Sequence, residues 1–210
     1  MTRIKLSRIS IVGGRLMRIV RPSLAVCAIL VCLNVSVPPA LSAQAGHVPQ
    51  TTPLILEKDE GERRAVRGWP GHPDPGETFI LKVDPKNGGS SHLVFLTADI
   101  RRGGGIPPHR HPGADEILFL ESGTARVHLG DATRVVHAGS TVFIPANTWI
   151  SVDNIGNDPI RAVAVFSAPG FEEFMRETSV LEGEKNIPLT KAENDAAEKK
   201  HSHAVIYKEP

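Results

Sequence analysis

The segment Gly103-Gly-Gly-Ile-Pro-Pro-His109-Arg-His111-Pro-Gly-Ala-Asp-Glu116-Ile-Leu-Phe-Leu-Glu-Ser-Gly123 is the most informative part of this 210-residue sequence. In an extended chain, side chains at positions i and i+2 lie on the same face, so His109 and His111 would point to a common interior. The two prolines before His109 favour an extended backbone and exclude a helix. A bare His-x-His pair in a turn rich in glycine and proline is, however, also typical of solvated loop histidines.

An acidic residue at the start of the next predicted strand completes the pattern. Glu116 follows a Pro-Gly turn and lies in register with Leu118 and Leu120, whereas Asp115 alternates to the opposite face. Two imidazoles and one carboxylate can bind a divalent transition metal and leave coordination positions open. We therefore predict that His109, His111 and Glu116 are metal ligands.

Short apolar or alternating runs, each ended by turn residues, surround this segment and recur about every 8–12 residues, which is typical of a β-sandwich or barrel. No βαβ rhythm and no internal repeat is present. The fold class is therefore all-β. The predicted strands are Phe79–Val83, Leu93–Ile100, Glu116–Leu120, Ala125–Leu129, Arg134–His137, Thr141–Ile144, Trp149–Val152 and Ile160–Phe166.

The pattern Gly103-x5-His109-x-His111-x4-Glu116-x6-Gly123 resembles the first signature of the cupin superfamily, with every fixed position present. The second signature is similar to Gly139-x5-Pro145-x-Asn147-x2-Ile150-x3-Asn154. The resemblance implies a double-stranded β-helix, a jelly-roll-like barrel with a metal inside, which we place at residues 78–168. Asn147 replaces the usual glycine, a tolerable change because asparagine accepts a positive φ.

The second departure concerns the metal, because Ile150 stands where cupins usually have a fourth ligand, a histidine. Three interpretations remain: a three-ligand site with extra open positions, a replacement ligand from elsewhere, or loss of the metal. Buried histidines and a glutamate without a metal would be costly, which argues against loss. Other histidines could replace the ligand, although His128 fits a surface hairpin and His201-Ser-His203 a solvated terminus. The replacement candidates are His92, His128, His137, His201 and His203; His47 and His72 receive no role.

The N-terminal 45 residues have the pattern of a secretory signal peptide. A basic region precedes the apolar run from Leu24 to Leu33, and small residues with an A-x-A-like end follow. The run is too short for a spanning helix, although an uncleaved anchor is the alternative. We predict export to the periplasm or medium, with no stable membrane insertion after the leader is removed. The mature chain would begin at Gln44 or Gly46, and translation could start at Met17.

The segments before and after the predicted barrel differ from it in composition. Residues 46–77 are proline-rich and are interpreted as an extended arm, which favours a homodimer because cupins tend to exchange N-terminal strands. Residues 169–210 are interpreted as a helical tail that packs outside the barrel as scaffolding. Its helices are predicted at Phe171–Glu177 and, opened by a capping box at Thr190, up to about Lys200.

Charge and cysteine content exclude several functions. Of 24 basic residues, six precede residue 22, and the remaining 18 face 23 acidic residues, which argues against nucleic-acid binding. Both cysteines lie in the leader, so thiol chemistry is excluded. The expected partner is a small molecule, in a pocket lined by apolar residues such as Leu118 and Val152.

The expected function is that of an exported metal-binding cupin. The resemblance implies iron, manganese, nickel, copper or zinc, and some similar cupins are dioxygenases that act on phenolic or enolic molecules. Glu116 would then be both a ligand and a catalytic proton acceptor. The alternatives are a non-catalytic cupin that binds a ligand or metal, and a purely structural barrel. A second catalytic group in the pocket would favour the enzyme, and the sequence alone identifies none.

Overall fold

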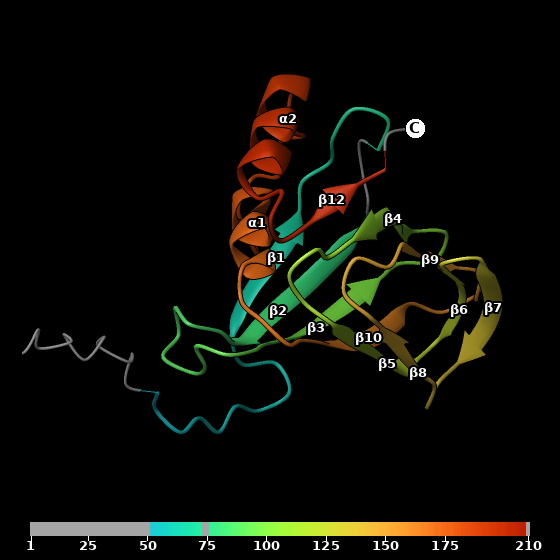
Figure 1. Cartoon of the computed structure of the whole chain (residues 1–210), viewed down its shortest axis with the longest axis horizontal. Coiled ribbons are helices and arrows are strands. Elements are labelled where there is room, and N and C mark those ends of the chain that lie inside the picture. The colour runs from blue at the N-terminus through green and yellow to red at the C-terminus, as the bar shows by residue number, and fades with distance from the viewer. Residues whose placement is uncertain (1–50, 73–75, 209–210) are drawn as a thin grey trace, which may run out of the picture. The chain divides into compact units, whose positions relative to one another are not determined.

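The computed structural model describes residues 51–72 and 76–208, and these residues form two antiparallel β-sheets with two short helices (Figure 1). The predicted leader, the start site and the mature N terminus lie outside the described residues. The larger sheet has the spatial order β11-β1-β2-β3-β10-β5-β8, and the smaller one β12-β4-β9-β6-β7. All strand pairs are antiparallel. The structure therefore confirms an all-β jelly-roll fold.

The strands of the larger sheet, in chain order, are β1 (Glu62–Val66), β2 (Glu77–Val83), β3 (Val94–Ile100), β5 (Glu116–Ser122), β8 (Thr141–Ile144), β10 (Ile160–Phe166) and β11 (Ser179–Leu181). Those of the smaller sheet are β4 (Gly105–Arg110), β6 (Thr124–Leu129), β7 (Ala132–His137), β9 (Ile150–Asn154) and β12 (Ile206–Tyr207). The helices are α1 (Phe171–Glu177) and α2 (Lys191–Lys200).

Strict alternation of side chains creates the core. Along β5, Leu118 and Leu120 are buried, and Ile117 and Phe119 are exposed. Inward residues of both sheets join one apolar cluster, so the sheets pack face to face. Glu116 shares the phase of Leu118, and this alternation alone carries its carboxylate into the interior.

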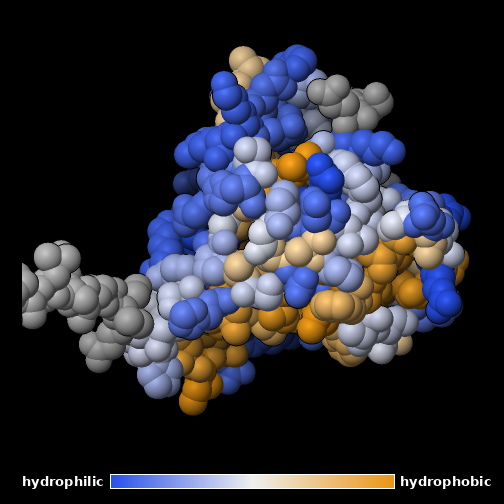
Figure 2. Space-filling model, viewed as in Figure 1, coloured by the Kyte–Doolittle hydropathy of each residue, from blue (hydrophilic) through white to orange (hydrophobic). Residues whose placement is uncertain are grey.

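The outward residues of β5 meet the neighbouring strand β8 in register, where Ile117 lies opposite Phe143. Both side chains are exposed. In Figure 2, hydrophobic surface gathers over the region where Figure 1 labels β5, β8 and β10. The apolar cluster inside the fold and the apolar surface outside it thus belong to opposite faces of the same strands.

All eight predicted strands are present, and four further strands were not predicted. β1 lies inside residues 46–77, so five residues of the predicted extended arm pair in the larger sheet between β2 and β11. β4 contains two prolines, which lack the amide hydrogen of the ladder, and its pairing with β9 shifts register between Ile106 and His109. β11 and β12 have three and two residues, too few to show a period.

Both helices were predicted correctly, including the reciprocal capping box between Thr190 and Glu193. The half-buried Arg176 ties α1 to Asp84, just after β2, at 2.6 Å and to Glu62 of β1 at 2.9 Å. Among the described residues, no helix is long and apolar enough to cross a membrane. Residues of the predicted tail also line the cavity beside the candidate metal centre.

Candidate metal centre

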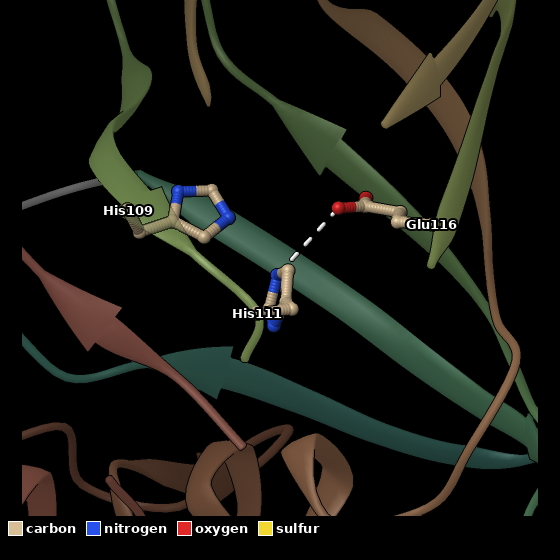
Figure 3. Close-up of side chains that lie close together, drawn as sticks. All are labelled: His109, His111 and Glu116. Carbon is tan, nitrogen blue, oxygen red and sulfur yellow. Dashed lines mark ion pairs between the residues drawn. The ribbon is translucent and has the colours of Figure 1, made fainter. Parts of the chain in front are cut away.

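Strand β4 and the start of β5 bring three metal-binding side chains together (Figure 3). His109 is the second-last residue of β4, His111 follows the strand, and Glu116 opens β5 after the intervening turn. The possible ligand atoms of the three residues all lie within 4.8 Å of one another. His111 Nε2 is 3.5 Å from Glu116 Oε2, the contact drawn in Figure 3. The spacing of the sequence motif is thus realised as a convergent cluster.

The orientation of both imidazole rings is fixed by backbone carbonyls. The Nδ1 atom of His109 lies 2.9 Å from the carbonyl oxygen of Pro107. The Nδ1 atom of His111 lies 2.9 Å from the carbonyl oxygen of Ala204. A carbonyl oxygen can only accept a hydrogen bond, so Nδ1 is the protonated nitrogen in each neutral ring. Both Nε2 lone pairs are therefore available for a metal.

Burial determines the charge state of the cluster. His109, His111 and Glu116 expose only 5%, 2% and 7% of their surfaces. Burial lowers the pKa of His109 to about 4, and burial together with the neighbouring His109 lowers the pKa of His111 to about 3. Burial raises the pKa of Glu116 to about 8. Without a metal, all three groups are therefore neutral at pH 7.

Two polar atoms of the cluster lack hydrogen-bond partners. Four buried side-chain atoms of the described residues have no hydrogen-bond partner, and two of them, His111 Nε2 and Glu116 Oε2, face each other. Such buried atoms usually find a partner, and each orphan costs about 1–3 kcal/mol. Two neutral imidazoles and one carboxylate are also suitable ligands for a divalent transition metal. The residues present therefore fit such an ion.

No fourth ligand joins the cluster from the described part of the chain. Ile150 lies directly opposite His109 in the β4–β9 register, so the two side chains share a face. It is 2% exposed and packed in the core. Ile150 thus gives the site an apolar neighbour.

The histidines considered as replacement ligands are not part of the cluster. His128 bonds Thr133, and His137 bonds Thr124 on the barrel surface. His92 and His203 are exposed. His201 was expected to be solvated, which is wrong: it is 6% exposed and its Nε2 lies 2.8 Å from Glu177.

A cavity of about 710 Å³ opens beside the cluster. His109 and Glu116 line it, together with apolar side chains from both sheets and from α1, including Phe79, Phe166 and Phe171. Leu118 and Val152 belong to this lining as predicted, and Leu120 also lines the cavity.

Several polar residues of the cavity wall were not predicted from the sequence, and two of them lie on strands. Glu77, at the start of β2, and Tyr207, in β12, both line the cavity. Burial raises the pKa of Glu77 to about 7, and burial followed by the charge of Glu77 raises the pKa of Tyr207. The apolar run Ala204-Val-Ile-Tyr207 was the available signal for β12, but nothing in the sequence indicates which cavity Tyr207 lines.

Residues 96–166 match the family model described as a cupin domain. The uncharacterized protein YrkC of Bacillus subtilis is 32% identical over 65 residues, which are 28% of this chain and 35% of YrkC. Germin-like protein 8-14 of Oryza sativa is 32% identical over 77 residues, which are 34% of this chain and 36% of that protein. The chain thus spans about a third of the length of these relatives.

Among solved structures, an RmlC-like cupin from Shewanella frigidimarina aligns with a TM-score of 0.48 and 14% identity, over 59% of this chain and 98% of that chain.

Proposed function

We propose, from the premise that this chain belongs to the cupin superfamily, that it is an exported metal-binding cupin with dioxygenase-like activity. His109, His111 and Glu116 would hold a divalent transition metal, and a small aromatic or enolic molecule would bind in the adjoining cavity. One observation carries the proposal: the buried His111 Nε2 and Glu116 Oε2 converge without hydrogen-bond partners. A donor set of two histidines and one carboxylate with open positions is typical of non-haem iron oxygenases.

The chain's own residues have separable tasks. Pro107 and Ala204 hold the two rings through their carbonyl oxygens, so each Nε2 faces the site. Glu116 would ligate as a carboxylate and take up a proton from the bound molecule. A bound metal would supply a Lewis acid and, if redox-active, a meeting point for oxygen and substrate.

The cavity supports the substrate class. Its aromatic and aliphatic walls suit a flat, largely apolar molecule, and it is large enough for a small organic ligand. Glu77 and Tyr207 are two of the polar groups that line the cavity. Glu77, whose pKa is raised to about 7, is a second titratable side chain in the cavity, and such a group favours an enzyme over a passive binding protein.

Elemental analysis of protein purified without chelator tests the metal. We expect one equivalent in the wild type, loss in His111→Ala, and retention in His128→Ala, whose histidine is half-exposed on β6. Equal metal in all three proteins would contradict the site. The exported fraction of the same cells should yield a chain that starts at Gln44 or Gly46, and uncleaved protein in the cytosol would contradict export.

Oxygen uptake tests the activity. The metal-loaded protein should consume oxygen with at least one member of a panel of small phenols and enols, and His111→Ala should not. Tight binding of such molecules without oxygen uptake would leave the alternative, a non-catalytic ligand-binding cupin.

A further inference from the structure

We infer that the C-terminal segment Ala204–Lys208 is a positioning element of the metal site, which selects the tautomer of His111. The inference rests on the proposed function, because it assumes that His111 is a ligand. Its central contact is the hydrogen bond from His111 Nδ1 to the carbonyl oxygen of Ala204, at 2.9 Å. The two residues are separated by 93 positions in the sequence.

The two histidines differ in how they are held. His109 bonds Pro107, two residues away on its own strand, so its tautomer is a local property of β4. His111 depends on a carbonyl that only the C-terminal segment delivers. Loss of that segment should therefore release His111 and leave the ring tautomer of His109 unchanged.

Strand β12 aligns the C-terminal segment with the site. Ile206 pairs with Arg110, and Tyr207 pairs with His109. The rings of Tyr207 and His109 lie 5.6 Å apart, and the amide of Lys208 donates to the carbonyl of Pro108 at 2.9 Å. In Figure 3, β12 is the red arrow that passes beside the two histidines. These contacts place Ala204 just before the strand, within reach of His111.

A tight turn anchors the other end of the segment. The amides of Ala204 and Val205 both donate to the carbonyl of His201, at 2.8 and 3.0 Å. His201 in turn contacts Glu177 at the end of α1. Val205 is fully buried in a second apolar cluster with Phe174. The carbonyl that orients His111 is therefore held by packing and not by a flexible terminus.

Two glycines allow the segment to approach this closely. A side chain at Gly113 would place its Cβ 3.2 Å from the carbonyl oxygen of His203, and one at Gly170 would place it 3.2 Å from the Cβ of Ala204. Both distances are tighter than ordinary contact. The turn after His111 and the start of α1 are therefore shaped to fit the segment.

The tautomers can be measured directly by nitrogen NMR of the metal-free protein with ¹⁵N-labelled histidine. In the wild type, both His109 and His111 should carry the proton on Nδ1. A chain that ends at His203 should keep this state for His109 and distribute His111 between both tautomers. A chain that ends at Lys208 is the matched control and should behave as the wild type. A wild-type His111 protonated on Nε2, or an unchanged His111 in the chain that ends at His203, would overturn the inference.

Zinc affinity provides the second readout. Loss of an outer-shell partner typically weakens metal binding by about 10–100-fold, and we expect this loss for the chain that ends at His203. If that chain does not fold, the full-length variant Val205→Gly loosens the same carbonyl and should shift both readouts in the same direction. A protein that binds no metal but shows the expected tautomers would refute the proposed metal site and leave only the selection of the His111 tautomer by the C-terminal segment.

Discussion

Replacing Glu116 by glutamine should remove a pH-dependent loss of stability from the metal-free protein. Glutamine keeps the shape of the side chain but cannot ionise. In the folded protein, burial raises the pKa of Glu116 from 4.5 to about 8. Between these values the folded chain keeps a proton that the unfolded chain has lost, so stability falls as the pH rises. The stabilisation by this proton on Glu116 is complete below pH 4.5 and is lost by about pH 8.

The magnitude follows from the same linkage. Each pH unit inside this range should lower the free energy of unfolding by about 1.4 kcal/mol. From pH 6.5 to 8 the wild type should therefore lose about 2 kcal/mol relative to Glu116→Gln. His109 and His111, whose pKa values are lowered in the folded chain, are present in both proteins, so their contribution cancels in the difference. Glu77, whose pKa is also raised, cancels because it is present in both proteins.

Urea denaturation in the presence of a chelator, across pH 6.5 to 8, measures the effect. The difference in free energy of unfolding between Glu116→Gln and the wild type should widen steadily with pH. The control is Glu121→Gln, an exposed carboxylate on the same strand, which should leave the slope unchanged. A difference that stays constant with pH would refute the reasoning, because Glu116 would then be hydrated. Added zinc should stabilise the wild type and not Glu116→Gln.

Two further predictions concern the metal directly. The metal must displace the proton of Glu116, so zinc affinity should rise about tenfold for each pH unit between pH 6.5 and 8 and then level off. Calorimetry measures this affinity, and an affinity that does not change with pH would contradict a raised pKa of Glu116. Ile150→His should place a third imidazole beside His109 and tighten zinc binding by about tenfold or more, as measured by chelator competition; an unchanged affinity in the folded variant would show that this side chain does not reach the metal.

The features predicted correctly from the sequence follow from the alternation of side chains over a few residues of a strand. Alternation along β5 separates Glu116 from Asp115, whose side chain instead accepts a hydrogen bond from the amide of Ala146 outside the core. The i, i+2 rule likewise placed His109 and His111 together. Each of these arguments uses neighbours a few residues apart, where backbone geometry alone determines which face a side chain occupies.

The features that were missed depend on contacts between residues that are far apart in the sequence. Nothing in the residue type of Ala204 marks its carbonyl as a partner for a ring 93 positions earlier. The two residues of β12 are too few for a pattern, and the charged helix before them suggested a solvated end. His201 was misassigned for the same reason, because its partner Glu177 belongs to a different helix. The side of the cavity formed by the tail could therefore not be predicted from residues that are neighbours in the sequence.

The energetic cost of the cluster bears on the three interpretations of Ile150. In the metal-free chain, Glu116 holds a proton that its unfolded form would release, and His111 Nε2 has no partner. Apolar side chains at these positions would pack without either cost. A barrel with no use for a metal would thus gain stability by losing this cluster, and Ile150 shows that the same wall accepts an apolar residue. The cost is understandable if three ligands suffice, because a bound ion would satisfy the orphaned atoms and take the place of the Glu116 proton.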